Sequence, residues 1–89
     1  MKSRASARFW ELFRQLPVEA QDQARDAYRT FTQNPKHPGL QFKRVSQARP
    51  VYSDRISRDQ RAVGILQGEG IIWFWVGNHK DYDRLVAGH

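Results

Sequence analysis

The feature that most constrains this chain is a change in the spacing of its apolar residues near Asn34. Before that point they recur every three or four positions, as they do along one face of an α-helix. From Leu40 onward they form short runs with the two-residue alternation of β-strands, and turn residues separate these runs. The chain has 89 residues, which is room for one domain. We therefore expect a single α+β domain over residues 1–89.

Two helices are predicted in the first part of the chain. The first covers residues 7–16, with Ser6 as its N-cap. Pro17 ends this helix and suits the first turn of a second one over residues 18–33. The sequence Asn34-Pro35 ends the second helix. The apolar faces of the two helices predict a helical hairpin that covers one face of a sheet.

The second part of the chain predicts an antiparallel sheet. Its strand segments are Leu40–Val45, Val51–Ile56, Arg61–Gln67 and Ile71–Val76. Short connections, such as the tight turn at Gly68-Glu69-Gly70, favour antiparallel neighbours. Residues 1–6 could form a frayed arm or a short edge strand, and Asp81–Val86 a final helical turn. The expected fold is an N-terminal helical hairpin on an antiparallel β-sheet of three to four strands, followed by a short C-terminal helical turn.

The charge of the chain favours a polyanionic partner. Fifteen Lys and Arg residues against nine Asp and Glu residues give a net charge of +6. Such a surface attracts nucleic acid, an acidic membrane surface or an acidic protein. A soluble domain that is merely basic remains the alternative.

Composition also excludes several kinds of chemistry. There is no cysteine, which excludes disulfides, zinc-thiolate sites and a cysteine nucleophile. His37, His79 and His89 are scattered, with no metal-ligand spacing, and no glycine-rich phosphate loop follows a strand. We therefore expect no metal and no small-molecule cofactor. The apolar run Ile71–Val76 is too short to cross a bilayer, and the basic N-terminus lacks a signal-peptide core, so we expect a cytoplasmic protein without membrane contact.

Two arginines on neighbouring predicted strands are candidates for phosphate binding. Arg55 and Arg61 lie on neighbouring strands across a short polar turn, and guanidinium groups suit bidentate contact with phosphate. Lys43 and Arg44 lie on the strand before them. An ordinary solvated basic face is the alternative interpretation.

His79 and Tyr82 follow the last strand, three residues apart, which places both side chains on one side of a turn or helix. Histidine can donate or accept a proton near neutral pH, and tyrosine can stack on a base or relay a proton. A lone loop histidine is more often a plain surface residue. Here it comes directly after a strand end, beside a tyrosine, on a basic protein.

Two further features have more than one interpretation. If Tyr52 and Ile56 point at the helices, alternation turns Asp54 inward with them, where a buried carboxylate needs a partner such as Arg61. Asp54 is then a structural ion pair or a solvated edge residue, or it orients a catalytic arginine. The same alternation places Trp73 and Trp75 on one face, for core packing or for base stacking.

The order of motifs resembles a known family. They are Leu40–Arg44, Val51–Ile56, Gln60–Leu66 and an apolar strand that leads into Val76–Tyr82. Preceded by two helices, they resemble the RelE/ParE superfamily, the toxins of bacterial type II toxin–antitoxin systems. The resemblance extends from about Phe9 to Leu85.

The C-terminal motif is most similar to the mRNA interferase branch, which includes RelE, YoeB, YafQ and HigB. That resemblance implies a metal-independent endoribonuclease that cleaves mRNA on the ribosome by attack of a 2′-OH, and so inhibits translation. It implies catalytic roles for Arg55, Arg61, His79 and Tyr82, and RNA contacts for Lys43, Arg44 and Lys80. Ser53 and Arg55 stand where RelE has two lysines, and Asp54 stands where an apolar residue is common.

The resemblance implies a cognate antitoxin, mRNA and the ribosome as partners. The groove beside Trp10, Phe13 and Tyr28 is a candidate antitoxin surface, or it is simply core. One alternative function is a ParE-like toxin that inhibits gyrase. Another is a degenerate, non-catalytic homologue that acts with its antitoxin in DNA-binding autorepression.

Overall fold

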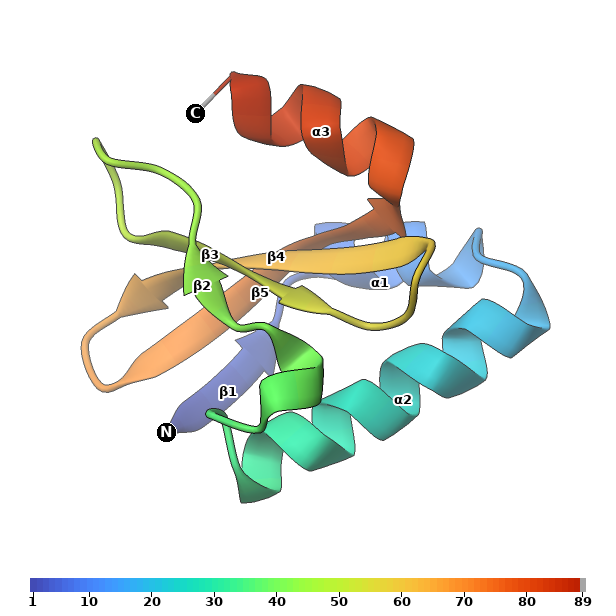
Figure 1. The fold of residues 1–89 in the computed structure, drawn as a ribbon, viewed down its shortest axis with the longest axis horizontal. Coiled ribbons are helices and arrows are strands. Elements are labelled where there is room, and N and C mark those ends of the chain that lie inside the picture. The colour runs from blue at the N-terminus through green and yellow to red at the C-terminus, as the bar shows by residue number, and fades with distance from the viewer. Residues whose placement is uncertain (89) are drawn as a thin grey trace.

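The structure is a computed structural model that describes residues 1–88; His89 lies outside the described residues. Three α-helices and five strands form two helical layers around one sheet (Figure 1). In chain order the elements are β1 (Lys2–Ala5), α1 (Ala7–Arg14), α2 (Val18–Gln33), a 3₁₀ turn (Pro38–Leu40), β2 (Lys43–Arg44), β3 (Val51–Arg55), β4 (Gln60–Gln67), β5 (Gly70–Asn78) and α3 (His79–Ala87).

The two predicted N-terminal helices are present. The side chain of Ser6 caps α1 by accepting a hydrogen bond from the amide of Phe9 at 3.2 Å. The bounds of α2 agree with the predicted helix, because Pro17 and Asn34 delimit it as expected. Apolar residues of both helices, such as Phe13 and Phe31, are buried against the sheet.

The sheet is larger than predicted and mixed. The strand order is β1-β5-β4-β3-β2, and four of the five strands form the expected antiparallel meander. The fifth is β1, which pairs in parallel with β5. Its position is held by a hydrogen bond from Trp73 Nε1 to Ser3 Oγ at 3.0 Å. The expectation of three to four antiparallel strands is therefore corrected, and of the two alternatives for residues 1–6 the structure has the edge strand.

The strand predicted over Leu40–Val45 is reduced to Lys43–Arg44. The chain before it turns through the 3₁₀ segment, and Gln41 adopts the left-handed conformation with φ of 47°. A left-handed residue interrupts the extended backbone that a longer strand needs. The result is a short outer strand at the edge of the sheet.

Helices cover both faces of the sheet, as Figure 1 shows. On one face α1 and α2 enclose the larger core, which contains Phe31, Ile71 and Trp73. On the other face α3 packs through Tyr82 against Val51 and Val63. The C-terminal segment is therefore a full helix of nine residues rather than a single turn. No helix within residues 1–88 is long and apolar enough to cross a membrane.

A bulge in β5 separates two tryptophans that alternation had placed together. The register moves from Val63–Trp75 to Gly64–Trp73, so β5 carries one additional residue, Phe74, at this point. An additional residue reverses the alternation of side chains beyond it. Trp73 consequently lies in the core under α1 and α2, whereas Trp75 lies on the face of α3. The prediction that these two side chains share a face was wrong.

Candidate functional site

The two candidate arginines are directly opposite each other in the sheet. Arg55 ends β3 and pairs with Arg61 of β4, which in turn pairs with Gly77 of β5. Val51 and Ser53 of β3 and Val63 of β4 face α3. Alternation therefore directs both arginines to the same face, at the end of the sheet where β5 continues into α3.

This arrangement of charge favours an anionic ligand. Like charges directly opposite each other on neighbouring strands destabilise a sheet. Neither arginine forms an ion pair with an acidic side chain within residues 1–88, although both are partly buried. A phosphate placed between the two guanidinium groups would remove the repulsion and could accept bidentate hydrogen bonds.

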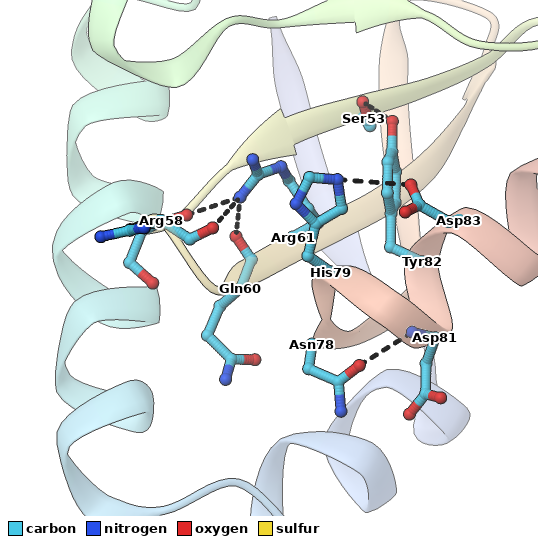
Figure 2. A network of polar contacts seen from close by, with 10 residues as sticks. Ser53, Arg58, Gln60, Arg61, Asn78, His79, Asp81, Tyr82 and Asp83 are labelled. Carbon is cyan, nitrogen blue, oxygen red and sulfur yellow. Dashed lines mark hydrogen bonds and ion pairs between the residues drawn. The ribbon is translucent and has the colours of Figure 1, made fainter.

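Arg61 is held by the turn that precedes it. Its Nη1 donates to the carbonyl oxygens of Ser57, Arg58 and Gln60, the last at 2.9 Å (Figure 2). Within residues 1–88, Nη1 donates all the hydrogen bonds that this guanidinium group forms. The side chain is thus fixed by one nitrogen, while Nε and Nη2 keep donors for a ligand.

The same turn is bonded to the start of α3. The amide of His79 donates to the carbonyl oxygen of Asp59 at 2.8 Å. The side chain of Asn78 caps α3 by accepting from the amide of Asp81 at 2.8 Å. These bonds place His79 at the first position of α3, at the same end of the sheet as Arg61 (Figure 2).

The imidazole of His79 is about half exposed, and its Nε2 lies 3.3 Å from Oδ1 of Asp83, one helical turn later. The Asp83 carboxylate thus lies on the Nε2 side of the ring, and the structure shows no hydrogen bond or ion pair to Nδ1 within residues 1–88. The ring centroids of His79 and Tyr82 are 5.8 Å apart. The three-residue spacing therefore places both rings on one side of α3, as the sequence indicated.

Tyr82 is buried rather than exposed to a ligand. Only 7% of its surface is accessible, and its hydroxyl forms a hydrogen bond of 3.0 Å with Ser53 Oγ in the interface of α3 and β3. In this arrangement a base could stack on Tyr82 only if α3 moved away. Through this hydrogen bond and its burial, Tyr82 anchors α3 on the sheet and so fixes the position of His79.

Trp75 is the aromatic side chain that borders the arginine row with part of its ring exposed. A Cβ atom added to Gly77 would lie 2.8 Å from Cζ2 of the Trp75 indole, so the indole covers the Gly77 backbone. Gly77 follows Arg61 in the row across the sheet. An indole beside a cationic pair is a suitable surface for an unpaired base.

The remaining predicted cations are divided between the two faces. Lys43 pairs with Ser53, so it lies on the face of α3 with the arginine row. Arg44 pairs with Tyr52 and therefore lies on the opposite face; its Nε donates to the carbonyl oxygen of Ser46 at 2.7 Å. Lys80 is exposed on the first turn of α3. The structure thus brings Lys43 to the candidate site and does not bring Arg44 there.

Asp54 does not pair with Arg61. It is 4% exposed and faces α1 and α2, whereas Arg61 faces α3. Its Oδ1 has no hydrogen-bond partner within residues 1–88. Burial raises the pKa of this carboxyl from 3.8 to about 7. The inward orientation was predicted, but the partner was wrong, because Arg61 lies one position away from the residue that pairs with Asp54, namely Ala62.

Sequence reasoning did not single out one cation of this region, and it left Trp75 open between core packing and base stacking. Arg58 is an exposed cation in the turn that holds Arg61, and the turn had been treated only as a polar connection. Arg58 lies in the short turn between Arg55 and Arg61, and three arginines so close together in the sequence indicate a cationic cluster. The position of Trp75 depends on the bulge, for which the alternation of residues contains no signal.

The fold matches solved structures of small bacterial toxins. A YoeB/ParE toxin from Agrobacterium tumefaciens superposes with a TM-score of 0.69 and 15% identity, covering 89% of this chain and 99% of that one. YafQ from E. coli gives 0.71 and 9%, covering 91% and 96%. A copper-bound L66S mutant toxin from Helicobacter pylori gives 0.61 and 16%, covering 91% and 97%. The chain therefore has the fold of the RelE-like toxins.

Sequence comparison names the family. Residues 19–84 match the family described as ParE-like toxin domain. The chain belongs to this family, within the RelE/ParE superfamily that its motifs resemble. A search of curated protein sequences finds no match.

Proposed function

We propose that this protein is the toxin of a type II toxin–antitoxin system and that it cleaves mRNA in the cytoplasm, on the ribosome. The observation that carries the proposal is the directly opposed pair Arg55 and Arg61, beside the start of α3. An unpaired row of two guanidinium groups is costly without an anion, and an RNA phosphate is an anion that fits it. The resemblance to mRNA interferases supports the same assignment.

The proposed reaction is attack of a ribose 2′-OH on the adjacent phosphate. The 2′-oxygen forms a bond to phosphorus, the bond to the 5′-oxygen breaks, and a 2′,3′-cyclic phosphate results. One group must accept the 2′ proton, another must protonate the 5′-oxygen, and cations must stabilise the phosphorane. No external nucleophile or metal is part of this scheme.

His79 is our candidate for one proton transfer. Its Nδ1 has the free lone pair when Asp83 holds the proton on Nε2. It therefore acts as the base for the 2′-OH, or as the acid once it has gained a second proton. Arg61 carries the phosphate charge with Nε and Nη2, and Arg55 assists from the opposite strand.

We assign RNA binding to the cations around this row. Lys43 and Lys80 attract the backbone on either side, and Trp75 stacks a base. Arg44 binds RNA only if the RNA extends to the opposite face, because its guanidinium is bonded to its own loop. Tyr82 acts through the position of α3, since its hydroxyl is bonded to Ser53.

The proposal is tested by cleavage of ribosome-bound message in a purified translation system. His79→Ala should lower the cleavage rate by about 10²–10⁴ while the protein remains folded. Arg61→Lys keeps the charge but loses bidentate geometry, and it should reduce the rate as well. Arg8→Gln is the matched control, because Arg8 is exposed on α1 and its one ion pair within residues 1–88 is with Glu11. Wild-type cleavage by His79→Ala would refute the role of His79.

The family match also supports a second candidate function, inhibition of gyrase. The matching family is described as ParE-like, and one similar structure is called a YoeB/ParE toxin. A gyrase inhibitor would leave mRNA intact and would block DNA supercoiling in a reaction with purified gyrase. This alternative would be favoured if the wild type left mRNA intact, and if both the wild type and His79→Ala inhibited supercoiling.

The family also implies a cognate antitoxin as partner. We propose that the antitoxin neutralises the toxin by covering the cationic face around Arg55 and Arg61, because this face attracts acidic chains. Co-expression of the acidic product of a neighbouring gene should restore growth and suppress cleavage.

A further inference from the structure

A pocket lies on the face of the sheet opposite the arginine row. It has a volume of about 350 Å³ and lies between α1, α2 and the strands beneath them. Its walls include Trp10, Phe13, Tyr28 and Trp73, together with Ile56, which directly follows β3. Trp10 and Tyr28 are 46% and 43% exposed, so the pocket opens to solvent between two aromatic side chains.

The wall of this pocket contains an acidic group that lacks a partner. Asp54 is 4% exposed and lines the pocket, and its Oδ1 has no hydrogen-bond partner within residues 1–88. A buried carboxylate without a partner is costly, and native proteins seldom retain one unless it has a function. Burial raises the pKa of this group to about 7, which is the consequence expected of a carboxylate that no cation relieves.

The two cations at the pocket do not relieve Asp54. Arg25 pairs with Asp22 at 3.3 Å and lies over the ring of Phe13 at 5.1 Å from its centre. Arg29 pairs with Asp26 at 3.1 Å. Both guanidinium groups are therefore neutralised by acidic residues one helical turn earlier in α2. Within residues 1–88 neither guanidinium group forms an ion pair with Asp54.

We propose that this pocket binds a small apolar amine, with its ammonium group on Asp54 and its apolar body between Trp10 and Tyr28. The ammonium supplies the donor that Oδ1 lacks, and the aromatic walls accept the apolar part and attract the cation. The volume is at the lower end of the range for ligand pockets, about 300–1,000 Å³. It suits a compound with one ring and a short stem rather than a dinucleotide or a peptide.

This inference goes beyond the proposed function and does not depend on it. The pocket contains none of the residues assigned to RNA cleavage. It does lie behind them, because Asp54 and Ile56 flank Arg55, the last residue of β3, and Ala62 follows Arg61 in β4. A ligand here would contact the opposite face of the strand segments that carry the arginine row.

The test uses phenethylamine and its neutral counterpart 2-phenylethanol as probes for the purified protein at about pH 8, where Asp54 is ionised. Binding is followed by NMR through the three indole N–H signals. Trp10 and Trp73 line the pocket, whereas Trp75 lies on the other face of the sheet and is an internal control. Phenethylamine should bind at least about tenfold more tightly than 2-phenylethanol and should shift the signals of Trp10 and Trp73.

Asp54→Asn is the decisive variant, because it removes the charge and keeps the shape. It should bind phenethylamine at least about tenfold more weakly than the wild type and leave the affinity for 2-phenylethanol unchanged. Tyr28→Ala, at the exposed rim, should weaken both probes. Equal affinity for the two probes, equal affinity for the amine in wild type and Asp54→Asn, shifts centred on Trp75, or no saturable binding up to about 10 mM would each overturn the proposal.

Discussion

The buried carboxyl of Asp54 makes the stability of the protein depend on pH. A rise in pKa from 3.8 to about 7 means that the folded state holds the proton more tightly than the unfolded state. Stability is therefore greatest below about pH 4 with respect to this group, falls as the pH rises toward 7, and is constant above it. At 1.36 kcal/mol for each pKa unit, the total loss is about 4 kcal/mol.

Asp54→Asn removes this dependence. The variant should be about as stable as the wild type near pH 4, and more stable by up to about 4 kcal/mol near pH 8. Urea unfolding followed by tryptophan fluorescence at several pH values measures the difference directly. Other carboxyl groups contribute to both curves and cancel when the curves are subtracted.

Glu69→Gln is the matched control, since Glu69 lies in an exposed turn and its substitution also removes one negative charge. Its difference from the wild type should be small at every pH. If the free energy of unfolding of Asp54→Asn ran parallel to that of the wild type from about pH 4 to about pH 8, the carboxyl would not be desolvated in solution, and this reasoning would be refuted.

Three further predictions concern packing. Tyr82→Phe should lower the free energy of unfolding by about 1 kcal/mol, because Ser53 loses its buried partner; adding Ser53→Ala should recover part of that loss in urea unfolding. Gly64→Ala should cost about 1–3 kcal/mol, since the new Cβ would lie 2.9 Å from Ile71 and from Trp73; an unchanged urea midpoint would contradict the packing. Deletion of residues 1–5 exposes the edge of β5 and should cause concentration-dependent association in sedimentation; a monomer at all concentrations would argue against it.

Local signals were sufficient for much of this fold. The bounds of α2 follow from Pro17 and Asn34, which act on their own backbone, and the cap at Ser6 is equally local. The position of Arg55 and Arg61 on neighbouring strands also followed from local information, because only a short turn joins β3 to β4. The expected grouping of Arg55, Arg61 and His79 at one end of the sheet depends on these short connections.

Non-local packing accounts for the errors. The parallel pairing of β1 with β5 joins segments from opposite ends of the described chain, and no turn connects them. The bulge at Phe74 depends on how β5 packs against β4, so alternation wrongly placed Trp73 and Trp75 on one face. The supposed Asp54–Arg61 pair failed because proximity along two strands does not decide which face each side chain occupies. In each case the missing information lies in another element of the fold.

The parallel pairing of β1 with β5 has a consequence for the newly made chain. Ser3 is synthesised 70 positions before its hydrogen-bond partner, Trp73. The edge of the sheet therefore cannot close, and His79 cannot reach the arginine row, until synthesis has passed residue 79. Contacts so distant in sequence slow folding. A nascent chain shorter than this has neither the closed sheet nor the complete candidate site, so any activity of the site begins only after nearly all of the described chain has been made.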